Sequence, residues 1–248
     1  MHQSFDTFDV DPDALWGTTP APLEGEALHV WRMPPVADPR CVARLWSVLS
    51  SDEQRRAGRL HREQGRSGFV IARGALRVLL GAYLRRAPDA LGFEYGPRGK
   101  PMLAPRGAPL QFNLSHTRGL CVLAFSRRRA LGVDVEALDR PLQVGPLARR
   151  VLDPVEHDAL LRVPETQRKQ ALLNAWTRKE AFLKATGEGL GGGLREVPVS
   201  LAPDEPARLL GDASATGAWD LWALEVGPSH VGALAAAAPA MPARAASA

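Results

Sequence analysis

Helical and strand-like segments alternate on both sides of a break in the apolar pattern, DRPLQVGP (139–146), and this constrains the fold more than any other feature. Before the break, apolar periodicity predicts strands and helices, at 28–33, about 39–49, about 66–86, 120–125 and 131–135. After it, the same patterns predict helices near 154–162 and 165–186 and strands at 219–226 and 230–238. The mixed order predicts an α+β fold built from two halves of similar size.

The ends of the chain differ from its middle. Residues 1–27 are acidic and contain proline, which predicts an extended arm. Residues 239–248 are rich in Ala and Pro, which predicts a disordered tail. Between them we expect an N-terminal α+β half over 28–138 and a C-terminal α+β half over 139–238.

The composition is typical of a soluble globular protein, with 45% hydrophobic and 23% charged residues among 248. No apolar run approaches the roughly 20 residues that are needed to cross a bilayer. The acidic N-terminus lacks the basic and apolar regions of a secretory signal. We therefore expect a cytoplasmic protein without a membrane partner.

Positive charge is concentrated in one region and is carried almost entirely by arginine. Between Arg55 and Arg86 there are nine arginines and one acid, Glu63, which suits nucleic acid, an acidic protein or a phosphorylated ligand. A solvated helix surface explains the same charge equally well. The chain uses 27 Arg and only 4 Lys, and three of these, Lys100, Lys179 and Lys184, fall in two short segments. Lys is a compact point charge on a slim stem, so these positions indicate a chemical or packing need.

Two carboxylates end the strand-like run GVDVE (132–136). Because side chains alternate along a strand, Asp134 and Glu136 project from one face, roughly 7 Å apart at Cα, while Val133 and Val135 point into a core. An ordinary solvent-facing strand end is the simpler explanation of this pair. An oxygen-only pair also suits Mg²⁺, which binds one or two carboxylates together with substrate phosphates and water.

A second cluster lies on the predicted helix 165–186. Trp176, Glu180 and Lys184 are spaced by four residues, which places them on one helix face. An exposed Glu–Lys pair worth about 0.3–0.5 kcal/mol is the simpler explanation. The scarcity of Lys in this chain favours a functional one.

A third cluster, Arg98-Gly99-Lys100-Pro101, lies in a Gly- and Pro-rich segment (96–109) that we expect to be a loop. Glycine lets the backbone approach an anion while Lys100 supplies charge. It is not a Walker-type phosphate loop, which needs GxxxxGK[ST] between a strand and a helix. A surface turn with incidental charge is the alternative.

Two further patterns invite functional readings that the chemistry does not support. Ser115 and His116 are adjacent in FNLSH (112–116), and in an extended chain adjacent side chains point to opposite faces, so they cannot form a nucleophile–base pair. His116 as a phosphate donor and a structural His remain equally open. Glycines in 187–192 match GxGxxG, but they follow a helix instead of joining a strand to one, so no dinucleotide site is predicted.

Taken together and in this order, the motifs resemble one family. FNLSH, then GVDVE about 16 residues on, then WTRKEAFLKATGEGL (176–190) about 40 residues further, resemble the Sfp-type 4′-phosphopantetheinyl transferases. The segments IARGALRVLL (71–80) and GPRGKP (96–101) fit the same family in order and spacing. The resemblance covers about residues 50–200. One departure is Thr117, where the family commonly has serine.

The resemblance implies a transferase that moves the phosphopantetheine arm of coenzyme A to a serine of an apo acyl or peptidyl carrier protein, releasing adenosine 3′,5′-bisphosphate. Carrier proteins of fatty-acid, polyketide or nonribosomal peptide synthesis are the acceptors it implies. It also implies a pseudo-dimer of two similar α+β halves, with coenzyme A and Mg²⁺ in the cleft between them, and a monomeric protein. The acidic carrier would give the Arg-rich region a complementary partner.

Matching positions carry the family's roles. Asp134, Glu136 and Glu180 would be the Mg²⁺ ligands. Glu180 would also be the base for the incoming serine, directly or through water, and Lys184 would contact the coenzyme A phosphates and steady the leaving group. The residues that would hold the nucleotide and its 3′-phosphate are Arg73, Arg98, Gly99, Lys100, Pro101, Ser115 and His116.

Two other classes compete with this enzyme. A non-catalytic coenzyme A or nucleotide-binding module would use the same cleft, but it has no need of a base, so the complete acid set with Lys184 argues against it. A nucleic-acid binder fits the basic region only, since the chain has no recognised reading motif or aromatic platform. We therefore expect no nucleic-acid partner.

Overall fold

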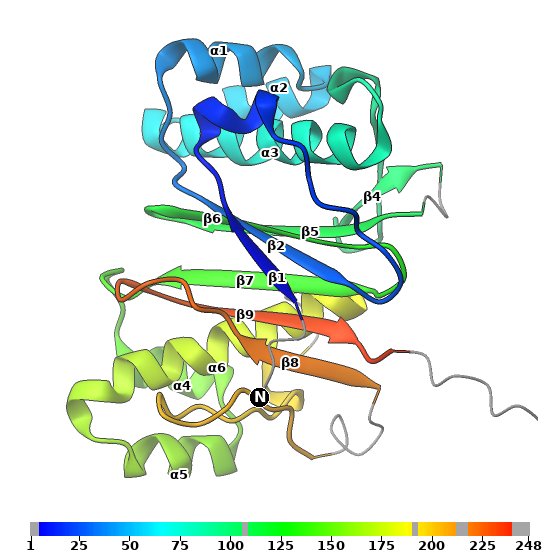
Figure 1. Cartoon of the computed structure of the whole chain (residues 1–248). Coiled ribbons are helices and arrows are strands. Elements are labelled where there is room, and N and C mark those ends of the chain that lie inside the picture. The colour runs from blue at the N-terminus through cyan, green and yellow to red at the C-terminus, as the bar shows by residue number, and fades with distance from the viewer. Residues whose placement is uncertain (1–4, 106–108, 190–192, 212–217, 240–248) are drawn as a thin grey trace, which may run out of the picture.

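Two β-sheets pack against each other in the middle of the molecule, and helices cover the outer side of each (Figure 1). The computed structural model describes residues 5–105, 109–189, 193–211 and 218–239. Before the break, its elements are, in chain order, β1 (Asp6–Asp9), β2 (Leu28–Met33), α1 (Pro39–Ser47), α2 (Ser51–Gly58), α3 (Glu63–Leu84), β3 (Gly92–Tyr95), β4 (Pro101–Ala104), β5 (Gln111–Thr117), β6 (Leu120–Ser126) and β7 (Leu131–Ala137). The later elements are α4 (Val144–Val151), α5 (Pro154–Arg162), α6 (Glu165–Thr186), β8 (Trp219–Ala223) and β9 (His230–Ala237). This mixture confirms the predicted α+β class.

The two main sheets differ in strand number and in strand direction. The first has the order β1-β2-β6-β5, with β1 parallel to β2 and the other neighbours antiparallel. The second has the order β7-β9-β8 and is antiparallel throughout, and β3 and β4 form a separate hairpin. Helices α1–α3 cover the first sheet and α4–α6 the second (Figure 1). Because β5 also lies against β7, the two sheets meet along these strands.

Alternation of side chains along a strand lets the first sheet serve two cores. Trp31 and Met33 of β2 pack into the core beneath α1–α3, whereas Leu28 and Val30 face the other sheet. From the second sheet, Val133 of β7 joins the same inter-sheet core. The period-two pattern of these strands thus fixes which residues face which layer.

Helix α3 is the longest apolar segment of the chain. By length and composition it could cross a membrane, and 78% of its most apolar window is buried inside the fold. Arg73 and Arg77 interrupt its apolar residues, so it contains no uninterrupted apolar run of that length. Its burial beneath α1 and α2 and above the first sheet identifies it as a core helix.

The two halves repeat one buried ion pair. Helices α3 and α6 each have 22 residues, and each follows a helix that begins with a capping box. The capping-box acids Glu53 and Glu156, both 2% exposed, bind Arg77 of α3 and Lys179 of α6. Each of these cations lies fourteen residues after the first residue of its helix, so the same contact recurs at the same place.

Residues 5–27 are not an extended arm, which corrects that part of the prediction for residues 1–27. Strand β1 pairs with β2, a short 3-10 helix spans Pro12–Gly17, and Leu15 and Leu23 are buried in the first core. Apolar residues spaced among acids and prolines were enough to attach the segment. Residues 1–4, and 240–248 of the predicted tail, lie outside the described residues, and the domain boundaries remain predictions.

Other differences fall where turns interrupt the pattern. The predicted helix at 39–49 ends at Ser47 and a second helix, α2, follows at Ser51. The expected loop 96–109 contains β4, and FNLSH forms most of β5. Helix α4 begins within the predicted break. By contrast, β2, α5 and α6 occupy the predicted residues.

Candidate active site

A cleft of about 610 Å³ opens where β5, the β3–β4 turn and α6 come together. Residues far apart in the sequence meet there. The predicted site residues on its wall are Arg73, Arg98, Gly99, Lys100, Pro101, Ser115, His116, Glu180 and Lys184. Asp134 lies directly behind Ser115 and Lys184, to which it is hydrogen-bonded.

Gly132 brings the acids of β7 close to α6. A Cβ at this position would lie 2.2 Å from the Ala181 carbonyl oxygen and 2.4 Å from the Ala185 amide nitrogen, so only glycine permits the contact. Asp134 follows two residues later on the same face of β7. Close packing at Gly132 therefore brings α6, with Glu180 and Lys184, close to β7.

Asp134 is buried and partly neutralised. Its Oδ1 accepts from the Ser115 hydroxyl at 2.8 Å and from the Lys184 ammonium at 2.7 Å. Its Oδ2 is buried and has no hydrogen-bond partner among the described residues. One oxygen is thus held by the protein, and the other is available to a ligand.

Glu180 is the second buried acid, 4% exposed. Its Oε1 also lacks a hydrogen-bond partner in the described part of the chain. Burial, and then the negative charge of Asp134, raise the pKa of Glu180 to about 7. A carboxylate with that pKa is suited to take up a proton near neutral pH.

Glu136 differs from the other two acids because it is ion-paired. The Arg140 guanidinium, four residues on, binds Glu136 Oε1 and also stands 5.9 Å from the centre of the Trp176 ring. Burial raises the pKa of Glu136, and Arg140 opposes that shift. Asp134 and Glu136 share a strand face as predicted, but Glu136 must be shared with Arg140.

The acids fit a divalent cation that is completed by substrate. In the described ranges, no three His, Cys, Asp or Glu side chains are gathered closely enough to hold a metal by themselves. Asp134 and Glu180, however, each hold an unpartnered buried oxygen, and repulsion between their charges contributes to the raised pKa of Glu180. Two carboxylates plus phosphate oxygens and water make a typical Mg²⁺ site.

Lys100 spans the boundary between the halves. Its ammonium donates to the carbonyls of Leu131 and Ala185, each at 3.1 Å. Burial lowers its pKa to about 8. An ammonium has three donors, so one remains for a ligand in the cleft.

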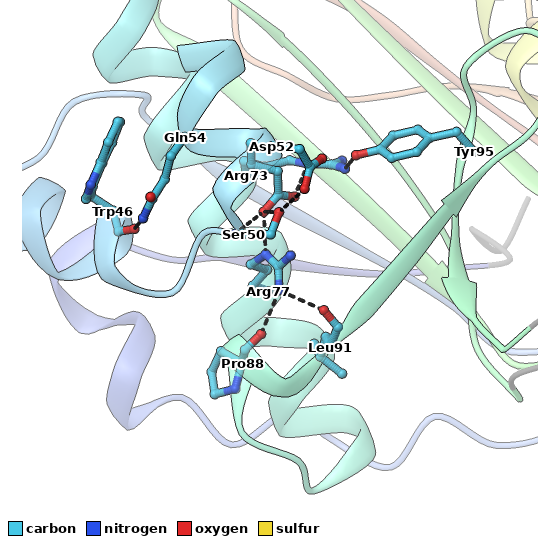
Figure 2. A network of polar contacts seen from close by, with 10 residues as sticks. Trp46, Ser50, Asp52, Gln54, Arg73, Arg77, Pro88, Leu91 and Tyr95 are labelled. Atoms are coloured by element: carbon cyan, nitrogen blue, oxygen red, sulfur yellow. Dashed lines mark hydrogen bonds and ion pairs between the residues drawn. The ribbon is translucent and has the colours of Figure 1, made fainter. Parts of the chain in front are cut away.

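Arg73 is bound by the protein more extensively than its predicted role in nucleotide binding suggested. Its Nε donates to Glu53 Oε1 at 2.7 Å and its terminal nitrogen to the Tyr95 hydroxyl at 2.9 Å (Figure 2). Glu53 also binds Arg77 at 2.6 Å. Two arginines thus share the Glu53 carboxylate, and Arg73 also lines the cleft.

Ser115 and His116 do not form a nucleophile–base pair. The Ser115 hydroxyl is engaged by Asp134 instead. The pKa of His116 is lowered by desolvation and then by the positive charges of Lys184 and Arg56. Lys184 and Arg56 thus place positive charge on this side of the cleft.

Several lining residues were missed from the sequence. Arg56 and Phe69 line the cleft, and the Arg56 guanidinium lies 5.5 Å from the Phe69 ring centre. Gly187 and Gly189, from the segment set aside as a false dinucleotide motif, also line it. A Cβ at Gly189 would lie 2.8 Å from the Arg98 Cβ, so this glycine allows two loops to meet. Asn113 is a further omission, and its signal was its place in FNLSH.

Comparison with known proteins shows the family of the chain. A model of the 4′-phosphopantetheinyl transferase superfamily matches residues 130–238. The 4′-phosphopantetheinyl transferase HetI of Nostoc sp. is 38% identical over 217 residues, which cover 87% of this chain and 90% of that protein. The chain belongs to the 4′-phosphopantetheinyl transferase superfamily.

Other relatives extend the similarity. A putative 4′-phosphopantetheinyl transferase, slr0495 of Synechocystis sp., is 35% identical over 78% of both chains. A 4′-phosphopantetheinyl transferase of Bacillus subtilis is 24% identical over 65% of this chain and 70% of its own. The predicted family and enzyme class are confirmed, and the chain is a 4′-phosphopantetheinyl transferase.

Proposed function

We propose that this transferase moves the phosphopantetheine arm of coenzyme A to a serine of an apo acyl or peptidyl carrier protein. The serine oxygen forms a bond to the β-phosphorus of the pyrophosphate, and the bond from that phosphorus to the bridging oxygen breaks. Adenosine 3′,5′-bisphosphate leaves with the electron pair. The observation that carries this proposal is the buried Glu180 beside Asp134 and Lys184 in one cleft.

Glu180 is the residue assigned to the serine proton. In the metal-free protein its pKa is about 7, and a cation bound between it and Asp134 would lower that pKa and favour the ionised carboxylate that can accept the proton. A carboxylate has two oxygens, so Glu180 could bind Mg²⁺ through one and accept the proton through the other, directly or through water. The proton leaves the serine as its oxygen attacks.

Asp134 and Glu180 would hold Mg²⁺, with Glu136 as a third ligand when Arg140 releases it. The metal would supply charge neutralisation on the pyrophosphate and alignment for displacement. Asp134 itself is oriented by Ser115, so one ligand is already positioned before substrate binds.

Cationic residues around the cleft would hold the phosphates of coenzyme A. Lys184 and Lys100 each retain a donor after their contacts with the protein. Arg98 and His116, with Gly99 and Pro101, complete the assigned nucleotide side, and Ser115, whose hydroxyl proton is donated to Asp134, lines the same side. Arg73 lines the cleft and would add positive charge there while its Nε stays bound to Glu53.

The repeated architecture supports a pseudo-dimer of two similar halves. Within the described residues, each half has three α-helices, of which the last has 22 residues, and each repeats the buried pair between a capping-box glutamate and a cation. Such a chain contains both sides of its own cleft, which favours a monomer. We place it in the cytoplasm, where carrier proteins are modified.

The direct test is incubation with coenzyme A, Mg²⁺ and a panel of apo carrier proteins, followed by intact-mass measurement of the carriers. We expect a mass gain of one phosphopantetheine group on at least one carrier, and none when EDTA is added or the carrier serine is replaced. The Glu180→Gln variant should bind coenzyme A without transfer. Coenzyme A binding with no transfer by the wild type would support the non-catalytic module instead.

A further inference from the structure

The edge of β7 that has no strand partner is hydrogen-bonded by side chains. One edge of this strand pairs with β9, and the other faces β5 across the boundary between the sheets. Four side-chain hydrogen bonds reach that second edge. Asn113 Oδ1 accepts from the Val133 N–H (3.0 Å) and Ser115 Oγ accepts from the Val135 N–H (3.4 Å). The ammonium groups of Lys184 and Lys100 donate to the carbonyl oxygens of Val133 (3.0 Å) and Leu131 (3.1 Å). Side chains therefore satisfy the strand edge where a backbone ladder would otherwise be needed.

The four side chains come from three separate elements, and all four line the cleft. Lys100, Ser115 and Lys184 already have roles toward substrate in the proposed mechanism. Asn113 has none, although it is only 5% exposed and its side chain crosses between the halves. A buried amide that spans this boundary needs an explanation of its own.

The geometry around Val133 supplies that explanation. Asn113 binds its N–H and Lys184 binds its carbonyl, so this residue is held on both sides. The next residue is Asp134, whose carboxylate is bound by Ser115, two residues after Asn113 on the same face of β5. Asn113 and Ser115 together fix the register of β5 against β7 at the proposed metal ligand.

We propose that Asn113 is a positioning residue for phosphopantetheinyl transfer. By accepting the Val133 N–H across the boundary, it sets where Asp134 and Lys184 stand relative to Ser115 and the β5 wall of the cleft. The role of Asp134 in that statement rests on the proposed function. A displacement of about 1 Å at such a centre is enough to slow a reaction about a hundredfold.

Asn174 offers a matched control. It is also a nearly buried asparagine (9% exposed) with one hydrogen bond from its side chain to the main chain, Nδ2 to Leu201 O at 3.2 Å. That bond stays within the C-terminal half and away from the cleft wall. Removing either amide should cost comparable stability, but only Asn113 connects to Asp134.

The test compares Asn113→Ala, Asn174→Ala and wild type for thermal stability, kcat, KM for coenzyme A and the Mg²⁺ concentration that gives half-maximal rate. We expect similar losses of stability in both variants. Asn113→Ala should lower kcat at least about tenfold and raise the Mg²⁺ requirement, with KM for coenzyme A changed less than about threefold. Asn174→Ala should keep the wild-type kcat.

Equal kcat values for the two variants would overturn the positioning role, as would a rise in KM for coenzyme A at unchanged kcat. If Asn113→Ala does not fold, Asn113→Thr carries the same test, because Ser115 shows that a hydroxyl on this face can reach a β7 amide. Its kcat should fall between those of Asn113→Ala and wild type. Failure of the proposed function is distinguishable, since the wild type itself would then transfer nothing.

Discussion

The Lys184 ammonium lies 2.7 Å from Oδ1 of Asp134. The same ammonium also donates to the carbonyl oxygen of Val133 at 3.0 Å, so two of its three protons are hydrogen-bonded before any substrate binds. One N–H donor remains, and the other two hydrogen bonds fix its direction. The pair is a partly buried ion pair in the cleft wall, and its lysine acts as a point charge of fixed direction.

Replacing Lys184 with arginine should therefore impair transfer, although the charge is kept. A planar guanidinium is wider than an ammonium and cannot meet a carbonyl and a carboxylate oxygen on the same short strand while still facing the cleft. We expect kcat/KM to fall at least about tenfold, or about 1.4 kcal/mol, in a carrier-labelling assay. Lys169→Arg, at the remaining lysine of the chain, is the control and should be silent. Full activity of Lys184→Arg would favour the simpler explanation of Lys184 as half of an exposed Glu–Lys pair.

Glu180→Gln should abolish transfer without loss of stability. The folded-state pKa of Glu180, about 7, lies above the usual value of 4.5. Between these pH values the folded protein binds more protons than the unfolded chain, so the wild type loses stability as the pH rises through that window. The variant lacks this loss and, in metal-free buffer at about pH 8, should melt at the same or a higher temperature. A lower melting temperature than wild type would show that Glu180 makes a stabilising contact.

Strong periodicity made much of the fold predictable. Helix α6 could be placed because apolar residues recur along it until Gly187, which adopts a left-handed φ of +83° and ends the helix. Residues 5–27 and β3–β4 were misjudged because short, polar or proline-containing strands depend on their neighbours for pairing. The local sequence does not contain those neighbours.

The site was predictable in its residue types and less so in its pairings. Lysine scarcity in an arginine-rich chain singled out Lys100, Lys179 and Lys184. Lys100 and Lys184 line the cleft, whereas Lys179 forms a buried ion pair with Glu156. What the sequence did not reveal was competition from the protein itself. Arg140 forms an ion pair with Glu136, and Glu53 forms one with Arg73. Both ion pairs depend on tertiary packing.

Competition at Glu136 can be measured through the metal requirement. If Glu136 is a Mg²⁺ ligand, Arg140 must release it, and Arg140→Gln should lower the Mg²⁺ concentration for half-maximal transfer by about threefold or more. Glu136→Gln should raise that concentration. If the metal requirement is unchanged in both variants, Asp134 and Glu180 hold the metal without a third carboxylate.

Removing the carboxylate of Glu53 should destabilise the N-terminal half strongly. Glu53 is bound by both Arg73 and Arg77, and Arg77 is 1% exposed (Figure 2). Breaking a buried ion pair from one side typically costs about 3–5 kcal/mol, because the partner charge stays buried. We expect Glu53→Gln to show a loss of that order in urea unfolding. Asp52→Asn, at the exposed neighbour, is the control. A loss below about 1 kcal/mol would mean that solvent reaches the arginines.

Lys100 allows the anion side of the cleft to be tested by proton linkage. Its pKa of about 8 means that, in the free protein at about pH 8.5, most of the side chain is neutral. A phosphate bound to the remaining donor would favour the charged form and raise that pKa, so binding would take up a proton. The affinity for coenzyme A should accordingly fall as the pH rises above about 8.

Calorimetric titration of the metal-free protein at about pH 8.5, in two buffers of different ionisation enthalpy, measures this proton uptake directly. We expect uptake with coenzyme A, and none with dephospho-coenzyme A if Lys100 contacts the 3′-phosphate. Lys100→Met should abolish the uptake with coenzyme A, whereas His116→Ala should not, because the lowered pKa of His116 leaves that group neutral at this pH with or without a moderate shift. Equal uptake with both nucleotides would assign Lys100 to the pyrophosphate. No uptake with either would leave Lys100 solely as the link between Leu131 and Ala185 across the two halves.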